Sequence, residues 1–280
     1  MRWEEGRRST NVEDRRGIGV GTIGGGGIGM LLLVLAVSCL TGVNPLALLQ
    51  IVEENQPAQT QSVPTGAPAN DPAAEFVSVV LADTEETWTR VFANAGKQYR
   101  EPVLVLFNDA VQSACGGASA ASGPFYCPSD QKVYLDLSFF RELDQRFGAP
   151  GDFAQAYVVA HEVGHHVQHL LGIDRQVREG QQQSYGRAGA NALSVALELQ
   201  ADCLAGVWGN HANKKNLLDA DDVDEGLRAA AAIGDDRLTR GRVSPDSFTH
   251  GTSEQRARWL RQGLSSGDIN NCDTFRSSTY

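Results

Sequence analysis

The stretch DFAQAYVVAHEVGHHVQHLLG, residues 152–172, decides the fold. Its apolar residues recur at every third or fourth position, which predicts a helix with one face in the core. We expect Asp152 to cap this helix at its N-terminus and Gly172 to end it. The small residues Ala160 and Gly164 would let a second element pack closely against it.

The same stretch contains His161-Glu162-Val163-Gly164-His165, an H-E-x-x-H pattern. Residues four apart lie on one face of a helix, so both imidazoles can point at a single metal ion. Neutral imidazole is a good zinc ligand. Glu162 is offset by one position and would reach the attacking water rather than the metal. The pattern therefore predicts a hydrolase site with Glu162 as the catalytic base, provided that a third ligand exists.

The third ligand is expected on a second predicted helix, NALSVALELQADCLAGVWGNHA at residues 191–212. Glu198 and Asp202 are four apart on this helix and share a face. A catalytic zinc site needs three protein ligands, an open fourth position and a partner that fixes the histidine tautomer. We therefore predict one Zn²⁺ per chain, held by His161, His165 and Glu198, with Asp202 supporting His161.

A metzincin site is not predicted. Gln168 and Leu171 stand where the metzincin pattern has its glycine and its third histidine. That pattern also needs a later methionine turn, and the chain contains only Met1 and Met30. The neighbouring histidines His166 and His169 are expected to support the site or to lie at the surface.

These segments resemble the bacterial neutral zinc metallopeptidase family, whose members are membrane-anchored and carry H-E-x-x-H and a later E-x-x-A-D. The E-x-x-A-D pattern is similar to that of gluzincin peptidases, in which the glutamate binds zinc and the aspartate supports a ligand histidine. The resemblance implies a zinc peptidase that acts on a peptide or protein substrate. The matching segments are residues 115–140, 161–168, 198–208, 229–238 and 249–260.

Peptide hydrolysis also needs a donor for the oxyanion of the tetrahedral intermediate, in addition to the metal. His250 is our candidate for this catalytic role, because it precedes a predicted capped helix and similar gluzincins carry a Thr-His pair at a comparable place. Arg256 would reinforce it. The alternative is a structural contact of His250 at the start of the helix. The nearby acidic residues Asp235 and Asp236 are expected to form a buried ion pair with Arg237.

The N-terminal region differs in composition from the rest of the chain. Residues 1–16 are polar and rich in arginine, and residues 17–52 carry no charge and are most apolar at 28–40. A segment of this length and composition can cross a membrane as a helix. Because the positive charges precede it, we expect the first residues on the cytoplasmic side.

The sequence thus predicts a single-pass protein of the bacterial inner membrane, with its C-terminal domain on the periplasmic or extracellular side. The membrane would be a partner, and a homodimer could form through the glycine-rich span, in which glycines recur every four residues. A cleaved signal peptide and a lipoprotein attached at Cys39 are the alternatives. The expected parts are a cytoplasmic segment at 1–16, a transmembrane signal anchor at 17–42, a flexible linker at 43–72 and a zinc metallopeptidase domain at 73–280.

Four cysteines lie in the predicted domain, and an exported domain permits disulfides. Cys115 and Cys127 are the obvious local pair, because they close a loop rich in glycine and serine. Cys203 and Cys272 would then tie the helix of the third ligand to the C-terminal tail. Four cysteines allow three pairings, so the sequence leaves the connectivity open.

The expected fold class is α+β: a mostly helical, zincin-like metallopeptidase domain with a small β-sheet, preceded by one transmembrane helix. An edge strand often aligns the substrate in such peptidases, and Val133–Leu137 is our candidate for it. The expected helices are 73–98, 138–147, 222–232 and 253–264, the last opened by a capping box from Thr252 to Gln255. The expected strands are 102–107 and 132–137.

The net charge of −10 and the absence of a basic stripe in the domain argue against nucleic-acid binding. Two other functions remain open beside the peptidase. The domain could be a non-catalytic zinc-binding interaction module on the membrane, although such a module has no use for a base at Glu162. It could also be a hydrolase of cell-wall peptides, which uses the same chemistry on a different substrate.

Overall fold

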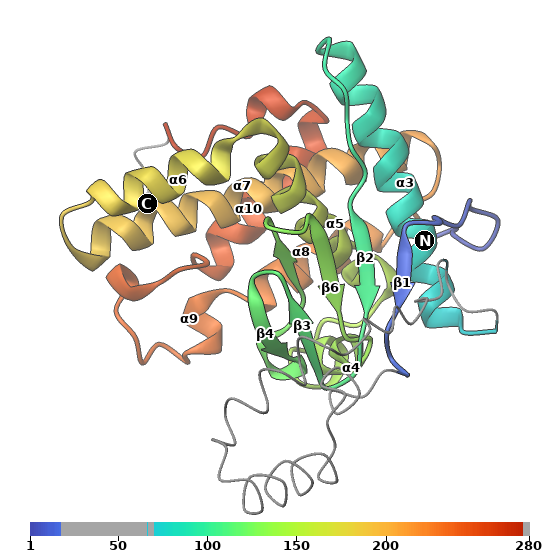
Figure 1. Cartoon of the computed structure of the whole chain (residues 1–280), viewed down its shortest axis with the longest axis horizontal. Coiled ribbons are helices and arrows are strands. Elements are labelled where there is room, and N and C mark those ends of the chain that lie inside the picture. Colours follow the sequence, from blue (N-terminus) through green and yellow to red (C-terminus); the bar gives the residue numbers. More distant parts are fainter. Residues whose placement is uncertain (18–65, 67–69, 277–280) are drawn as a thin grey trace, which may run out of the picture.

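Helix α5 (Asp152–Leu171) is the element around which the computed structural model of the chain is arranged (Figure 1). It packs against the five helices α3, α4, α6, α7 and α8 and against the sheet, and most of its residues are buried, as the apolar periodicity predicts. It ends at Gly172, whose φ of 75° is the left-handed conformation that glycine adopts easily. The predicted cap at Asp152 is wrong: Gly151 is the capping residue, and Asp152 is the first residue of the helix.

The structure describes residues 1–17, 66 and 70–276. The other helices are α3 (Pro72–Asn94), α4 (Ser138–Gln145), α6 (Ile173–Gln183), α7 (Gly186–Lys214), α8 (Asp222–Ala232), α9 (Asp235–Leu238) and α10 (Ser253–Ser266). The strands are β1 (Val12–Asp14), β2 (Val103–Leu106), β3 (Ala110–Ser113), β4 (Gly116–Ser119), β5 (Phe125–Cys127) and β6 (Lys132–Leu135). Short 3₁₀ helices occupy Ala120–Ser122, Pro245–Ser247 and Ile269–Asn271. The prediction of a mostly helical α+β fold is confirmed.

Four strands form one sheet in the order β1-β2-β6-β5. Strands β1, β2 and β6 run parallel, and β5 runs antiparallel to β6. The predicted edge strand at Val133–Leu137 is therefore wrong, since β6 has a neighbour on each side. Strand β5 is the edge of the sheet on the side where its residues approach α5. Strands β3 and β4 form a separate antiparallel hairpin.

The main core lies between the sheet and the helices. Its largest fully buried side chains are Trp88, Trp208, Tyr157 and Phe153. Tyr134 and Phe107 are buried in a second, smaller cluster. Figure 1 shows α3 on one side of the molecule, next to the N-terminus, and the α6–α7 pair on the other. Helix α6 was not predicted, because its sequence is almost entirely polar and offers no long apolar stripe.

Close helix crossings depend on glycine at three positions. A Cβ atom on Gly164 would lie 3.0 Å from the carbonyl oxygen of Ala201, so α5 and α7 approach closely beside the motif. A Cβ atom on Gly263 of α10 would lie only 1.9 Å from the carbonyl oxygen of Cys203 in α7. Gly206 makes the reciprocal close approach to α10. These crossings fix how α7 lies against both of its neighbours.

The N-terminal segment is part of this fold. Strand β1 pairs with β2, and Val12 is fully buried in the main core. The buried carboxylate of Glu85 on α3 accepts hydrogen bonds from Ser9 and Asn11. The amino group of Met1 lies between the start of α5 and the start of α8, 2.8 Å from a carboxylate oxygen of Asp152. Residues 1–16 therefore belong to the same folded body as the rest of the described chain.

The predicted single-pass arrangement in the inner membrane is wrong. Among residues 1–17, 66 and 70–276, no helix combines the length and the apolar character that a membrane crossing requires. Residues 1–16, predicted to lie across a membrane from the domain, instead add a strand to its sheet. Apart from Gly17, the predicted anchor at 17–42 falls outside the described residues.

Both of the disulfides considered above are present. Cys115–Cys127 joins the turn of the β3–β4 hairpin to the end of edge strand β5. Cys203–Cys272 joins α7 to the C-terminal tail, with both cysteines buried. The first disulfide constrains a sheet edge, and the second constrains the chain that follows α10.

Candidate metal centre

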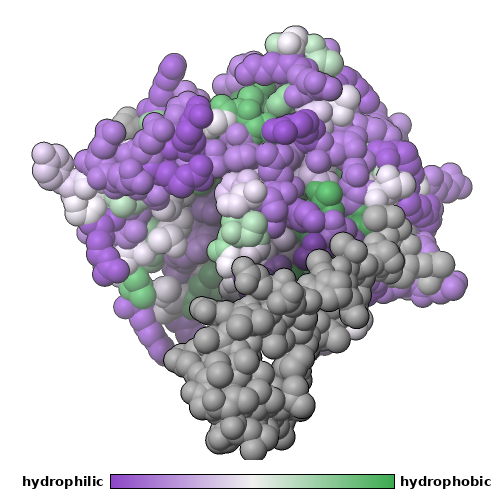
Figure 2. Space-filling model, in the orientation of Figure 1, coloured by the Kyte–Doolittle hydropathy of each residue, from purple (hydrophilic) through white to green (hydrophobic). Residues whose placement is uncertain are grey.

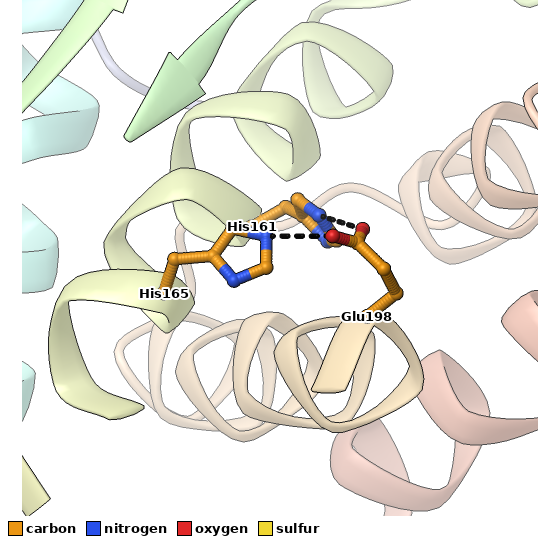
Figure 3. Close-up of side chains that lie close together, drawn as sticks. All are labelled: His161, His165 and Glu198. Carbon is orange, nitrogen blue, oxygen red and sulfur yellow. Dashed lines mark hydrogen bonds and ion pairs between the residues drawn. The ribbon is translucent and has the colours of Figure 1, made fainter. Parts of the chain in front are cut away.

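Two helices bring the three predicted ligands together, as Figure 3 shows: His161 and His165 project from α5, and Glu198 projects from α7. The Nε2 atom of His161 lies 3.2 Å from one carboxylate oxygen of Glu198. The Nε2 atom of His165 lies 3.4 Å from the other. One potential ligand atom from each residue falls within 4.8 Å of the others. The spacing of four along α5 produces this convergence, because it places both rings on one face.

The chemistry of these atoms fits a zinc ion. Two imidazole nitrogens and a carboxylate oxygen are a usual donor set for catalytic zinc, with a fourth position left open. Burial alone would lower the pKa of His161, but the charge and hydrogen bond of Asp202 outweigh it and raise the pKa to about 10. The carboxylates thus favour a positive charge at this point, and a bound divalent cation supplies one.

A buried network holds His161. Its Nδ1 atom lies 2.9 Å from Asp202, which has no exposed surface. Asp202 also accepts hydrogen bonds from the hydroxyl of Tyr157 at 2.5 Å and from Nε of Arg256 at 2.9 Å. Arg256 is 2 % exposed, so its charge balances that of Asp202 inside the protein. Arg256 is predicted to reinforce His250, whereas the structure pairs it with Asp202.

Glu162 lines the same cavity as the predicted ligands and is 8 % exposed. Burial raises the pKa of its carboxyl group above the ordinary value for glutamate. In the described part of the chain, no side chain donates a hydrogen bond to this carboxylate. Its carboxylate is therefore available to a water molecule in the cavity.

The cavity is an open cleft of about 700 Å³. Figure 2 shows a hollow on the face of the molecule between α9 and β4, with apolar residues at its depth and a mostly hydrophilic surface around it. Edge strand β5 and the segment before it form one wall. Aromatic and aliphatic side chains line much of the cleft, including Phe125, Tyr126, Phe139, Phe147 and Val158.

His250 lines this cleft too, with its side chain 49 % exposed. Its Nδ1 atom lies 3.1 Å from a carboxylate oxygen of Asp235. The other oxygen of Asp235 accepts hydrogen bonds from the backbone amides of Thr249 and His250, both at 2.7 Å. The hydrogen bond to Asp235 raises the pKa of His250, which favours its protonated form. The predicted ion pair of Asp235 with Arg237 is not what the structure shows, and the support that Asp235 gives His250 was missed.

The other two histidines of α5 point away from the ligand set. His166 is fully buried, with Nδ1 2.9 Å from the hydroxyl of Tyr126 and Nε2 2.6 Å from the carbonyl oxygen of Arg100. Burial lowers its pKa to about 4, so it is neutral. His169 contacts Asp174 at the start of α6. His166 therefore links α5 to strand β5, and His169 links α5 to α6.

A second group of carboxylates lies at the far end of α5. Asp152, Asp222 and Glu225 place oxygen atoms within 4.8 Å of one another. The amino group of Met1 lies among them and forms ion pairs with Asp152 and Asp222. The positive charge at this cluster therefore comes from the chain itself.

Comparisons with known proteins place the chain in one family. The model of a family described as "Putative neutral zinc metallopeptidase" matches residues 1–275. The chain is 48 % identical to YpfJ, described as an uncharacterized protein of Escherichia coli (strain K12), over 99 % of this chain and 100 % of that protein. It is 41 % identical to the uncharacterized protein Rv2575 of Mycobacterium tuberculosis (strain ATCC 25618 / H37Rv), over 76 % of this chain and 74 % of that one. No solved structure matches the chain.

Proposed function

The chain belongs to the neutral zinc metallopeptidase family, and from that membership we propose that it is a zinc-dependent peptidase acting on a peptide or protein substrate. One observation carries the proposal. Two imidazole nitrogens and a carboxylate converge within 4.8 Å, and the buried carboxylate of Glu162 shares their open cleft. A purely structural metal site is closed and has no use for an unpaired carboxylate beside it.

His161, His165 and Glu198 would hold one zinc ion per chain. When bound, zinc polarises the carbonyl group of the scissile bond and makes the attacking water more acidic. Glu198 suits the ligand role because its position on α7 is fixed by the close crossing at Gly164. Asp202 keeps the Nδ1 atom of His161 engaged, so that Nε2 faces the cleft.

Glu162 would act as the general base. It takes a proton from the attacking water as the new carbon–oxygen bond forms, and it then gives that proton to the leaving amine as the peptide bond breaks. The two transfers leave Glu162 in its starting state. Its raised pKa assists the first transfer, because a carboxylate whose conjugate acid has a higher pKa is a stronger base towards the attacking water.

His250 would stabilise the oxyanion that develops on the carbonyl oxygen of the substrate. Its Nδ1 atom is occupied by Asp235, which leaves Nε2–H free to donate into the cleft. Such donors lower the barrier because the charge they stabilise exists only in the transition state and the intermediate. Asp235 is a positioning residue in this account, since it holds the backbone and the ring of His250 together.

Strand β5 would align the substrate. It is the free edge of the four-stranded sheet beside α5, and Phe125 and Tyr126 both line the cleft. An extended peptide can add to such an edge through backbone hydrogen bonds. Alignment of the substrate by an edge strand is predicted from the sequence, but for β6; in the structure the edge strand is its neighbour β5.

The test is a digest of casein and of a peptide library by the zinc-loaded chain and by Glu162→Gln. The variant keeps the size of the side chain but cannot accept a proton. We expect cleavage by the parent and a loss of at least about 100-fold in the variant, with zinc content unchanged. Equal cleavage of these substrates by the parent and by Glu162→Gln would reject the proposed peptidase activity.

A hydrolase of cell-wall peptides is the same proposal with a different substrate, and peptidoglycan fragments in the same assay address it. An interaction module that only binds zinc predicts no cleavage by either protein. Zinc analysis of Glu198→Ala is the matching test of the ligand set, since it should lower the zinc content below one ion per chain.

A further inference from the structure

We infer that Gln168 and Gln200 form a hydrogen-bonded relay that fixes His165 as a zinc ligand and connects it to the C-terminal tail. The inference rests on the zinc-binding part of the proposed function and not on peptide cleavage. It concerns the Nδ1 atom of His165: among the described residues, Asp202 lies at Nδ1 of His161, whereas an amide, that of Gln168, lies at Nδ1 of His165.

The relay is continuous at the level of atoms. The Nδ1 atom of His165 lies 2.8 Å from Oε1 of Gln168. The Nε2 atom of Gln168 donates to the carbonyl oxygen of Leu197 at 2.7 Å and to Oε1 of Gln200 at 3.1 Å. The Nε2 atom of Gln200 donates to the carbonyl oxygen of Cys272 at 2.9 Å.

The direction of every bond in the relay follows from its fixed end. A backbone carbonyl only accepts, so the groups facing Leu197 and Cys272 must be the NH₂ groups of the two glutamines. The carbonyl oxygen of Gln168 is then the atom that faces His165. That oxygen accepts, so Nδ1 of His165 carries the proton and the lone pair lies on Nε2, the atom that points at Glu198 (Figure 3).

Burial fixes the orientation of both glutamine amides. Gln168 has no exposed surface and Gln200 is 8 % exposed, so water does not offer either amide an alternative partner of equal quality. Turning either amide over would set oxygen against oxygen and leave buried donors unsatisfied, which is costly inside a protein. The relay therefore preselects the tautomer that zinc needs, in the way that carboxylate partners do at other zinc sites.

The far end of the relay is anchored to α7 by the tail itself. Cys272 forms the disulfide with Cys203, one turn after Leu199 and Gln200 on the same helix. Thr274 donates from its hydroxyl to the carbonyl oxygen of Ala196 at 2.6 Å. The tail is thus held at two points on either side of Gln200. The side chains of Gln200 and Gln168 connect it from there to His165.

The test measures zinc affinity of the full chain by competition with a chromogenic chelator. Gln168→Leu removes both the acceptor for His165 and the donor to Gln200, and we expect it to weaken zinc binding by about 10- to 100-fold. Gln168→Glu keeps an acceptor for Nδ1–H, so its loss should be clearly smaller. Gln200→Leu removes only the outer link and should give a loss between that of Gln168→Leu and none.

Gln181→Leu is the matched control, because Gln181 also bridges two helices with its amide, donating to Ser194, but does not touch a ligand. Its zinc affinity should equal that of the parent. Equal affinity of the parent and Gln168→Leu overturns the relay, as does an equal loss in Gln168→Leu and Gln168→Glu, which would show that the acceptor is irrelevant. If Gln168→Leu does not fold, Gln200→Leu decides in the same way. A parent that binds no zinc would instead reject the metal site of the proposed function.

Discussion

At the scale of single residues, the site is built from pairs of side chains, in each of which a carboxylate or amide holds a histidine. Asp202 holds His161, Gln168 holds His165, and Asp235 holds His250. Only the first of these pairs could be predicted, because Glu198 and Asp202 are related by helical spacing within one segment. The partners of His165 and His250 come from tertiary contacts, for which a single sequence offers no spacing rule.

Asp202→Asn tests the first pair. The change leaves the buried charge of Arg256 without its partner, so we expect a loss of about 3–5 kcal/mol in the free energy of unfolding. Zinc affinity should also fall by about 10- to 100-fold, because the amide holds the ring of His161 less well. Urea unfolding and chelator competition measure the two effects.

The control for that experiment is Asp174→Asn, which removes a carboxylate from His169 rather than from a predicted ligand. Its zinc affinity should not change. A similar loss of affinity in both variants would mean that the support of Asp202 is not specific to the metal site.

His250→Gln tests the predicted oxyanion donor. We expect kcat to fall by about 100- to 1,000-fold, with KM changed only a few-fold, because the interaction forms in the transition state. Asp235→Asn should give a smaller fall in kcat, since it weakens the positioning of His250 and leaves the ring in place. Steady-state kinetics on a cleaved peptide measure both, and unchanged kcat in His250→Gln would reduce His250 to a structural contact.

At the scale of elements, the cleft depends on how closely α7 crosses α5 and α10. The strongly periodic helices α5, α7, α8 and α10 were predictable, since each has an apolar face that must be buried. Helix α6 was missed because it is polar, and β5 was missed because three residues are too few to show alternation. The error over the edge strand followed from this, since β6 is an edge only if β5 is absent.

Gly263→Ala tests the crossing of α10 and α7. The added methyl group would meet the carbonyl oxygen of Cys203 at 1.9 Å, so backbone must move. We expect a loss of about 4 kcal/mol in the free energy of unfolding, above the roughly 1–3 kcal/mol of ordinary overpacking. Thermal and urea unfolding measure it.

Gly189→Ala is the matched control on α7. Its Cβ would lie 3.4 Å from the Cβ of Ser184, which is an ordinary contact, and the position is exposed. Alanine should stabilise this helix by about 0.5–1 kcal/mol relative to glycine. Equal effects of the two substitutions would contradict the close crossing at Gly263.

At the scale of the whole molecule, both ends of the described chain bear on the two helices that carry the site. The amino group of Met1 lies at the start of α5, and the C-terminal tail supports Gln200 on α7. The sequence offers the disulfide that ties the tail to α7 as one possible pairing, but it indicates neither the contact of Met1 nor the hydrogen bond of Gln200. The charge of residues 1–16 predicts a separate polar segment, yet most of its arginines pair with acidic residues of the domain, as Arg7 does with Glu85.

The amino group of Met1 gives the molecule a pH dependence. Burial alone would lower its pKa, but hydrogen bonds and charges from Asp152 and Asp222 outweigh it and raise the pKa from 8.0 to about 10. A group whose pKa is raised on folding stabilises the fold fully at pH values below its pKa in the unfolded chain. That stabilisation is lost as the pH rises through its pKa in the folded chain. We expect a loss of about 1–2 kcal/mol between pH 7 and pH 11 from this group, less than the full shift would give, because the amino group is partly solvated.

Urea unfolding of the free and the N-acetylated chain separates this group from lysines and tyrosines that titrate in the same range. The acetylated chain should be less stable at pH 7, and the difference between the two should vanish by about pH 11. A constant difference at all pH values would show that the ion pairs of Met1 do not contribute.

The most direct test of the central claim is zinc-edge X-ray absorption on the purified full chain, combined with its zinc content. The account predicts one zinc ion per chain, with two imidazole nitrogens and otherwise oxygen at about 2.0–2.2 Å, and loss of one oxygen neighbour of protein origin in Glu198→Ala. A sulfur neighbour at about 2.3 Å, or a spectrum with fewer than two imidazoles, would contradict a site made of His161, His165 and Glu198.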